Sequence, residues 1–345
     1  MTPEQWERLL AVMEGGLIEP LPVGFIIDSP WLPGWSGTST SDYFSSDRVW
    51  FDANLKAVER FPDIMFLPGF WAEFGMCTEP SAFGAECSWG ENALPHPGKI
   101  ISDIKGIDSI NKPNPKTDGL LPSVLNRLKR YQHQIEQAGH AIKFAVSRGP
   151  LTVASFVLDT TEFLTAIRTN PDKVHKLMET ITGFIIDWLE VQMETFSSID
   201  GVFILDDIVG FLGPDDFKEM ALPYLSRIFR RFDVSVKFFH NDAAGLVCAP
   251  HLAGIGVNLF NFSYRHTLEE MRSRAGAYIT LLGNIPPRDV MAAGVGEDVR
   301  SSVRAAIDSV QDKRRIILSC GGGMPPGVPT ENIEVFLSAA GYESH

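Results

Sequence analysis

Charged and metal-binding residues follow directly after short apolar runs in the second half of this 345-residue chain. Asp206 and Asp207 follow one run, and His240 and Asp242 follow the next. Zinc accepts both imidazole and carboxylate, so the His240-x-Asp242 pair has the chemistry of a metal site, and Cys320 after the last run could supply a soft third ligand. An open fourth position would make such a site catalytic. The alternative is that His240 and Asp242 only hydrogen-bond to each other and to a loop.

Four charged residues are candidates for acid–base chemistry or substrate binding. Asp206 or Asp207 could act as a general base, orient His240 or bind the metal, whereas an ordinary helix N-cap is the alternative for either. Glu73 lies among aromatic residues, where it could be an acid of raised pKa or a ligand, or else an exposed loop residue. Arg148 could bind an anionic substrate or pair with one of the two aspartates.

The residues expected to contact the substrate are Trp35, Trp71, Asn261, Asn284 and Gly322. The two asparagines end apolar runs, and Gly322 belongs to a glycine-rich segment whose backbone could approach a ligand closely or bind phosphate. This segment lacks the Lys-Ser/Thr ending of a P-loop, which excludes nucleotide hydrolysis. No G-x-G-x-x-G follows a predicted strand and no G-x-S-x-G occurs, which argues against dinucleotide cofactors and α/β-hydrolase chemistry.

Apolar runs that precede these polar residues predict β-strands. From about residue 141 they alternate regularly with helical stretches, and they are continuously apolar rather than strictly alternating, as is typical of parallel strands covered on both faces. The predicted strands are 21–27, 63–70, 142–147, 201–205, 234–239, 256–262, 278–283 and 315–319. Helical periodicity predicts helices over 3–15, 48–61 and 120–140 and one that begins at Asn170-Pro171, while 28–45 and 77–122 are expected to be mostly loops.

Repeated strand–helix units imply a parallel sheet, and chain length alone does not distinguish a closed barrel from an open sheet. In an α/β barrel the catalytic groups come from the C-terminal ends of the strands, which is where the polar residues lie in this chain. We expect one domain over residues 1–345, with an N-terminal extension and the first barrel units in 1–140 and regular strand–helix units in 141–345.

The composition excludes several classes of partner. The formal charge of −13 and the lack of a basic stripe argue against nucleic acid and anionic membranes as partners. No apolar run approaches the ~18 residues that span a bilayer, and the N-terminus does not resemble a signal peptide. The four cysteines form no C-x-x-C pair, so we expect free thiols in a cytoplasmic protein, with Cys77 and Cys248 as packing residues.

Four segments, 206–228, 238–245, 281–294 and 315–336, resemble the uroporphyrinogen decarboxylase superfamily. The strand end "GNIPP" and the tail "PPGVPTENI", in this order, carry most of the likeness. The resemblance implies a (β/α)8 barrel. True uroporphyrinogen decarboxylases have an arginine-rich N-terminal motif that binds porphyrin carboxylates, and the corresponding "IIDSPWLPGWSG" contains no arginine.

The chain is more similar to the corrinoid-dependent methyltransferases of this superfamily, in which a His-x-Cys pair and a later Cys hold zinc. His240 matches that pattern, but Asp242 stands at the first cysteine position. Ungapped alignment of the tail places Gly322 at the second cysteine position, two residues after Cys320. Carboxylate in place of thiolate makes the metal a harder Lewis acid, which suits an oxygen ligand better than a thiolate.

The resemblance therefore implies methyl transfer between a small O-methyl compound and a corrinoid carried by a partner protein, with zinc or an acid such as Glu73 polarising the leaving oxygen. One alternative is a decarboxylase or related lyase, in which Arg148 holds a carboxylate and Asp206 or Asp207 manages protons. The other alternative is a non-catalytic protein that binds a corrinoid or tetrapyrrole. The sequence does not predict the oligomeric state.

Overall fold

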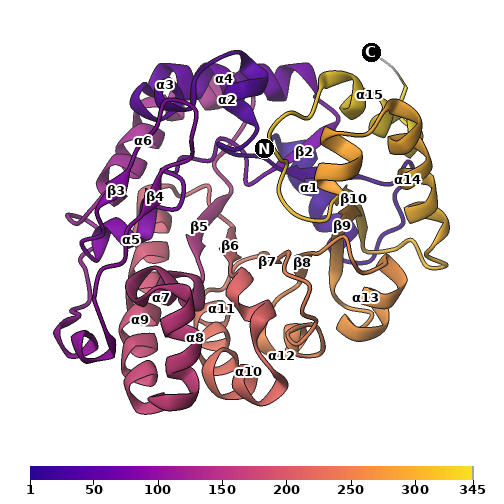
Figure 1. The fold of residues 1–345 in the computed structure, drawn as a ribbon. Helices are drawn as coiled ribbons and strands as arrows, with labels where there is room; N and C mark the ends of the chain where they lie inside the picture. The colour runs from indigo at the N-terminus through magenta and orange to yellow at the C-terminus, as the bar shows by residue number, and fades with distance from the viewer. Residues whose placement is uncertain (344–345) are drawn as a thin grey trace.

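A curled sheet of eight parallel strands forms the centre of the molecule in the computed structural model, which describes residues 1–343. The strand order is β2-β1-β10-β9-β8-β7-β6-β5, and helices pack around the outer face of the sheet (Figure 1). The strands are β1 (Val23–Ile26), β2 (Ile64–Leu67), β5 (Phe144–Arg148), β6 (Gly201–Leu205), β7 (Val236–Asn241), β8 (Leu259–Phe262), β9 (Thr280–Ile285) and β10 (Ile316–Cys320). Each coincides with a predicted strand, and the predicted (β/α)8 barrel is confirmed.

Alternate residues of each strand point to opposite faces of the sheet, and the two faces belong to two different apolar clusters. The outer cluster joins the strands to the helices. The inner cluster fills the barrel, and its strand residues are Ile26, Met65, Leu67, Phe144, Phe203, Val236, Phe238, Leu259, Leu282 and Ile317. Membership of one cluster or the other therefore shows which way each side chain near a strand end points.

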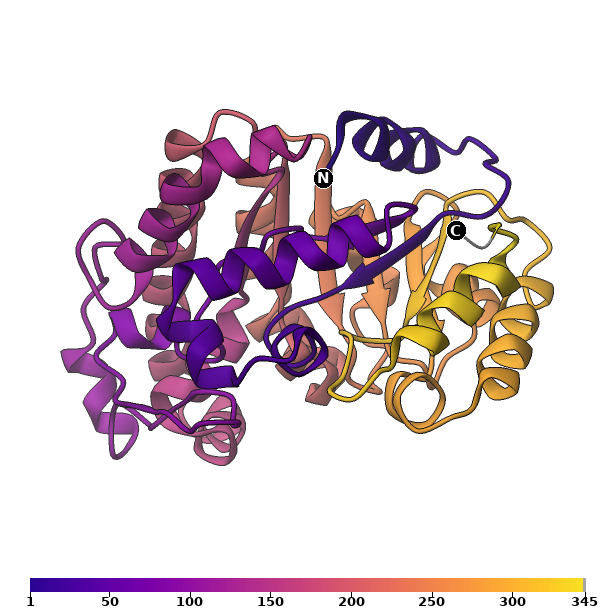
Figure 2. The same cartoon turned by 90° about the horizontal axis from the view of Figure 1, so that it is seen from above.

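Helix α1 (Pro3–Met13) closes the N-terminal end of the barrel. It begins with a capping box at Thr2, and Trp6, Leu9, Val12 and Met13 belong to the inner cluster. The rings of Trp6 and Phe144, the first residue of β5, lie 5.6 Å apart. Figure 2 shows α1, in indigo, lying across the tails of the strand arrows. Because α1 covers this end of the barrel, an active site is expected at the opposite end, where the strands end.

The outer layer consists mainly of helices that connect successive strands (Figure 1). The longest is α9, which begins at the predicted position, although Asn170 makes no side-chain capping bond. These helices are α4 (Asp47–Arg60), α6 (Leu121–Gln137), α7 (Pro150–Leu158), α8 (Thr160–Thr169), α9 (Pro171–Thr195), α10 (Pro214–Met220), α11 (Leu222–Arg231), α12 (Leu252–Ile255), α13 (Leu268–Ala275), α14 (Gly296–Asp308) and α15 (Thr330–Ala340). Two short turns, η3 (Ala249–His251) and η4 (Pro287–Ala292), lie in the same layer.

Short elements occupy the two stretches that were expected to be mostly loops. Residues 28–45 contain α2 (Leu32–Ser36) and α3 (Thr40–Ser45). Residues 77–122 contain α5 (Thr78–Ala82), a two-stranded ribbon of β3 (Cys87–Ser88) and β4 (His96–Pro97), and the 3-10 helix η1 (Ile104–Ser109). Each helix has only one or two turns, too short for helical periodicity to appear in the sequence.

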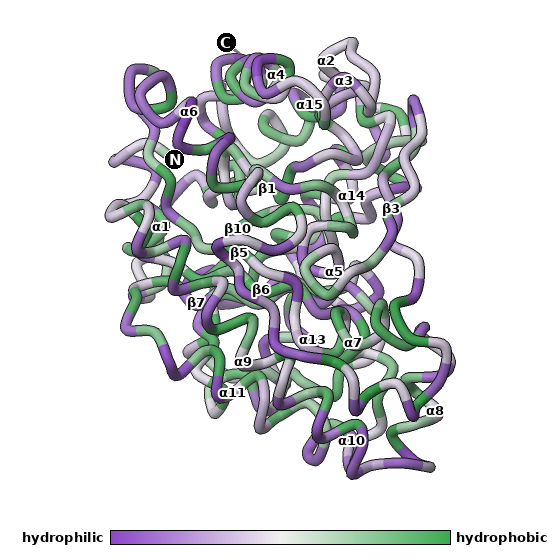
Figure 3. Tube along the Cα trace, turned by 90° about the vertical axis from the view of Figure 1, so that its left-hand side faces the viewer, coloured by the Kyte–Doolittle hydropathy of each residue, from purple (hydrophilic) through white to green (hydrophobic). Residues whose placement is uncertain are grey.

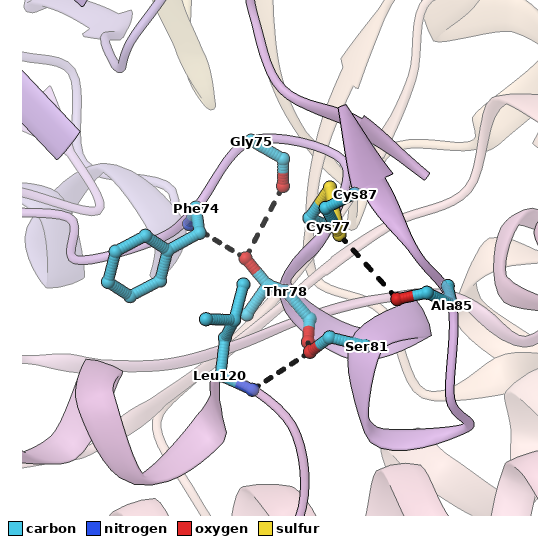
Figure 4. The surroundings of a disulfide bond; sticks show 8 residues. All are labelled: Phe74, Gly75, Cys77, Thr78, Ser81, Ala85, Cys87 and Leu120. Carbon is cyan, nitrogen blue, oxygen red and sulfur yellow. Dashed lines mark hydrogen bonds between the residues drawn. A yellow bond between two sulfur atoms is a disulfide. The ribbon is translucent and has the colours of Figure 1, made fainter. Parts of the chain in front are cut away.

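Cys77 and Cys87 form a disulfide, which corrects the expectation of four free thiols (Figure 4). Cys77 directly precedes α5, whose Thr78 and Ser81 hydrogen-bond to neighbouring backbone, and Cys87 lies in β3. Cys77 is thus a cross-link and not merely a packing residue. The expectation for Cys248 is confirmed, because it is free and buried in the outer cluster.

Across residues 1–343, no helix is both long and apolar enough to cross a membrane. Hydrophobic and hydrophilic residues alternate along the outer helices (Figure 3), as expected for helices with one face on a core and one face exposed.

Candidate active site

Three potential metal ligands meet at the C-terminal end of β6 and β7. Ligand atoms of Asp207, His240 and Asp242 all lie within 4.8 Å of one another. Asp207 begins the 3-10 helix η2 (Asp207–Phe211) directly after β6, His240 points inward from β7, and Asp242 lies just beyond it. His240 Nε2 is 3.6 Å from Asp207 Oδ1, which also accepts a 3.0 Å hydrogen bond from the backbone N–H of Asp242. The structure therefore brings the predicted pair, His240 and Asp242, together and adds Asp207 as a third potential ligand.

Asn261 fixes the orientation of the His240 ring. The Nδ2 group of Asn261 donates to the carbonyl oxygens of Leu282 (2.8 Å) and Cys320 (3.0 Å). Because carbonyls only accept, Oδ1 of Asn261 must face Nδ1 of His240, at 2.7 Å. His240 then carries its proton on Nδ1 and presents the Nε2 lone pair toward Asp207, the arrangement that a metal-binding histidine requires. Asn261, which was predicted to contact the substrate, thus orients the His240 ring and selects its tautomer.

The electrostatics of this cluster favour a bound cation. Burial raises the pKa of Asp207 to about 6, an effect that His240 opposes and Asp242 strengthens. Two carboxylates this close repel each other, and a divalent cation between them would offset that repulsion. One imidazole nitrogen and two carboxylate oxygens form a three-ligand set of the kind that leaves an open position on zinc.

Cys320 is not part of this cluster, and its prediction as a metal ligand is wrong. Its side chain lies in the outer cluster with Ile316 and Leu318, whereas Ile317 points into the barrel. Burial also raises the pKa of the Cys320 thiol, which disfavours the thiolate that a metal needs. Gly322 is the residue of this segment that reaches the cluster, because a Cβ there would lie 2.7 Å from Asp242 Oδ2.

Arg148 is held by two buried glutamates. Its Nη2 donates to Glu73 Oε2 (2.9 Å) and its Nη1 to Glu79 Oε2 (3.0 Å), while its backbone N–H donates to Glu79 Oε1 (3.1 Å). The Nε atom contacts Met76 Sδ at 3.3 Å. Burial alone would lower the pKa of Arg148, but Glu79 and Glu73 raise it, so the guanidinium stays charged.

This arrangement corrects two sequence expectations. Arg148 pairs with Glu73 and Glu79 instead of Asp206 or Asp207. Each guanidinium nitrogen already has a partner, so the group has little remaining hydrogen-bonding capacity for an anionic substrate. Glu73 is buried and not an exposed loop residue. Glu79 was missed because it lies in a stretch without strand or helix periodicity, where one acidic residue gives no signal.

Asp206 performs the alternative role foreseen for an aspartate at this position. Its carboxylate accepts hydrogen bonds from the backbone N–H groups of Leu151 (2.9 Å) and Thr152 (3.0 Å) and from the Thr152 hydroxyl (2.8 Å), at the start of α7. Burial raises the pKa of Asp206 to about 7, against the lowering effect of these donors. A Cβ at Gly149 would overlap this carboxylate, so glycine is required there. Asp206 positions the strand end and does not face the cluster.

The remaining predicted residues lie at three different places. Trp71 lines a cavity between β2 and β5, beside Glu73 and Arg148, whose free volume of about 30 Å³ suits one or two water molecules and no substrate. Trp35 stacks on Trp31 at 4.7 Å and lines a separate depression. Asn284 donates from Nδ2 to the carbonyl oxygen of His266.

Strand register places Arg148 and the Asp207–His240–Asp242 cluster at the same level of the barrel. Arg148 pairs with Leu205, and Leu205 pairs with His240, in three neighbouring strands. Two strand spacings separate Arg148 and His240 by about 10 Å. Both features therefore face the same end of one barrel, which is where α/β-barrel enzymes have their active sites.

The fold and the polar cluster at its C-terminal end define an α/β-barrel enzyme, and comparisons with known proteins identify its family. A family model described as uroporphyrinogen decarboxylase (URO-D) matches residues 4–341. The chain belongs to the uroporphyrinogen decarboxylase family.

Its relatives are distant in sequence. Uroporphyrinogen decarboxylase from Psychromonas ingrahamii is 24% identical over 275 residues (76% of this chain, 75% of that protein). The enzyme of the same name from Thioalkalivibrio sulfidiphilus is 22% identical over 352 residues (96% of both chains). The solved structure of a methyltransferase from Methanosarcina mazei has the same fold, with a TM-score of 0.80 at 19% identity, covering 96% of this chain and 97% of that one.

Proposed function

We propose that this protein is a metal-assisted methyltransferase that moves a methyl group between a small O-methyl compound and a corrinoid carried by a partner protein. The observation that carries the proposal is the Asp207–His240–Asp242 cluster, a set of nitrogen and oxygen ligands at the mouth of the barrel. The likeness in fold to a methyltransferase agrees with this reaction class.

His240, Asp207 and Asp242 would hold the metal, and Asn261 keeps the His240 ring in the tautomer that binds it. A bound zinc ion would supply Lewis-acid polarisation of the ether oxygen. The carboxylates favour a hard oxygen ligand over a sulfur one.

Residues near β1 and β5 argue against a polycarboxylate substrate. The segment after β1 presents Asp28 where the porphyrin-binding arginines of true decarboxylases would be expected, and Arg148 is occupied by two glutamates. A negatively charged substrate would meet an excess of carboxylates here.

Decarboxylation of a smaller acid is the second candidate, favoured by the curated relatives named uroporphyrinogen decarboxylase. It would require Arg148 to exchange one glutamate for the substrate carboxylate. Release of carbon dioxide by metal-free protein, abolished in Arg148→Lys, would favour this reaction over methyl transfer.

Metal content measured by mass spectrometry tests the site directly. We expect about one zinc per chain in the wild type and a loss in His240→Ala. His175→Ala is a matched control, because His175 Nε2 lies 3.6 Å from a Glu219 oxygen, the same separation as His240 from Asp207, but on the outer helices. Zinc retained by His240→Ala, or lost equally from both variants, would contradict the assignment.

The reaction itself is tested by mixing the protein with a reduced corrinoid protein and a panel of methoxylated compounds. Alkylation of cobalt, followed by its absorbance, is the expected result. A wild-type protein that loads zinc but alkylates cobalt with no compound would reject the methyltransferase assignment and leave the metal site standing.

A further inference from the structure

We propose that Asp28, on the opposite wall of the barrel from the Asp207–His240–Asp242 cluster, donates the proton that the leaving oxygen of the methyl donor receives. This inference rests on the proposed function and adds a catalytic residue to it. Nothing in the sequence pattern distinguished Asp28, since it lies in a Pro- and Gly-rich loop segment.

The topology places Asp28 across the barrel mouth from His240. In the eight-stranded order, β1 and β7 are separated by three strands on the β10 side and by three on the β2 side, so they lie opposite each other. Ile26 belongs to the inner cluster and Ile27 to the outer cluster, so the alternation directs Asp28 inward, two residues beyond Ile26. A substrate bound at the Asp207–His240–Asp242 cluster would therefore face Asp28.

The backbone around Asp28 is fixed. Its carbonyl oxygen accepts hydrogen bonds from the N–H groups of Trp31 (3.2 Å) and Leu32 (3.0 Å). The indole N–H of Trp31 in turn donates to the carbonyl of Val328, at 3.0 Å, which ties this loop to the segment after β10. A proton donor held in this way needs little reorganisation during the reaction.

The carboxyl neighbours of Asp28 already share one guanidinium. Glu73 accepts from the Ser29 hydroxyl (2.8 Å) and from Arg148, and both oxygens of Glu79 accept from Arg148. One guanidinium therefore faces two carboxylates. These two carboxyl groups already outnumber the one guanidinium, so a charge on Asp28 would add to an uncompensated excess, and the protonated form of Asp28 is favoured.

The titration of Asp28 follows from these surroundings. Burial raises the pKa of Asp28 well above its usual range, Glu73 raises it further and Arg148 opposes the increase. The phenol of Tyr43, from α3, is also close and is neutral, since burial raises its pKa as well. Its oxygen accepts from Asn54 Nδ2 at 3.3 Å. A neutral Asp28 carboxyl can thus donate a proton at neutral pH, as a general acid must.

The step balances as follows. The C–O bond of the methyl donor breaks and its electron pair stays on oxygen, while the methyl carbon bonds to the reduced corrinoid of the partner, which supplies two electrons. The proton of Asp28 forms the new O–H bond, and the product is an alcohol or phenol. Asp28 is left as a carboxylate, and solvent returns its proton after product release.

Two measurements on Asp28→Asn test the inference, with the exposed Asp52→Asn as control. The first is the infrared difference spectrum of the protein alone in the region of protonated carboxyl groups. Because Asp206, with a pKa of about 7, also contributes to this region, we expect wild type minus Asp28→Asn to show a protonated-carboxyl band and wild type minus Asp52→Asn to show none. The second is the methyl-transfer rate with methyl ethers of graded leaving-group basicity. We expect a loss of roughly 10²–10⁴-fold for the most basic leaving oxygens and little loss for the most acidic phenols.

The outcomes distinguish the role of Asp28 from the proposed function. A wild type that transfers methyl groups, with the same loss in Asp28→Asn for every ether, would overturn the role of Asp28 alone, as would a protonated-carboxyl band of undiminished intensity in Asp28→Asn. A wild type that transfers no methyl group from any ether would overturn the proposed function and, with it, this role. The infrared band reports the proton on Asp28 independently of turnover.

Discussion

The Nδ1 atom of His240 lies 2.7 Å from Oδ1 of Asn261, and the two side chains occupy paired positions of β7 and β8. Asn261 is itself held by two carbonyl oxygens, so it cannot rotate to present its amide N–H groups to the ring. A side chain two strands away from Asp207 thus decides which nitrogen of His240 is available to a metal.

Replacement of Asn261 by leucine is expected to weaken zinc binding about 10- to 100-fold, because the His240 ring loses the acceptor that selects its tautomer. Titration with a competing chelator measures the dissociation constant. Asn258→Leu is the matched control, since Asn258 also bonds to neighbouring backbone (2.7 and 2.9 Å) but at the other end of β8. Equal affinities of Asn261→Leu and the wild type would contradict the role of Asn261.

Gly322→Ala should damage the metal site through Asp242. The new Cβ would lie 2.7 Å from Asp242 Oδ2, and Gly322 has a φ of 135°, which side-chain-bearing residues rarely adopt. We expect a lower zinc affinity and a loss of about 1–3 kcal/mol in the free energy of unfolding. Gly323→Ala is the control, because its nearest contact is 3.9 Å away. Unfolding in urea and chelator titration give the two quantities, and identical results for the two variants would reject the proposed closeness of Gly322 to the site.

Arg148→Met is expected to lower the free energy of unfolding by about 3–5 kcal/mol, because it leaves Glu73 and Glu79 buried without a counter-charge. Arg168→Met removes the ion pair of a largely exposed arginine with Asp216 (2.8 Å) and should cost about 0–1 kcal/mol. If Arg148→Met does not fold, the triple variant that also carries Glu73→Gln and Glu79→Gln should recover folded protein. A triple variant less stable than Arg148→Met would argue against charge imbalance as the cause.

The free energy of unfolding should fall as pH decreases from 6.5 toward 4, in part because of His140. Burial lowers the pKa of His140 to about 4, and the nearby N-terminal ammonium group adds to this. The unfolded chain, with an ordinary histidine pKa of 6.5, binds the proton first, so acid favours unfolding in this window and the effect levels off below pH 4. Urea unfolding at several pH values should show a flatter profile for His140→Gln, whereas the exposed His133→Gln should keep the wild-type slope.

Thiol titration checks the Cys77–Cys87 disulfide. Protein denatured without reductant should react at two thiols, Cys248 and Cys320, and reduced protein at four. Cys87→Ser should lose about 2–4 kcal/mol in the free energy of unfolding, since the cross-link restricts the unfolded chain. Four reactive thiols in the unreduced protein would show that the cross-link is absent.

Much of the fold could be predicted from the sequence. All eight strands of the sheet were visible as short apolar runs, because strands covered on both faces are mostly apolar along their length. Polar residues at the run ends then pointed to the functional end of the barrel, and His240 and Asp242 were recognisable as a pair because they are two residues apart on one strand end, where side chains share a face.

The same uniform hydrophobicity hid the direction of individual side chains. With every position of 201–205 apolar, no alternation indicates whether Asp206 or Asp207 points inward, and Cys320 likewise follows a run that gives no sign of facing the helices. Only the tertiary structure decided these directions, together with contacts between segments far apart in the chain, such as Arg148 with Glu79 or Gly322 with Asp242. The physical reason is that hydrophobic patterning determines which segments are buried, whereas the neighbours of each polar group depend on how the closed sheet brings its separate strand ends together.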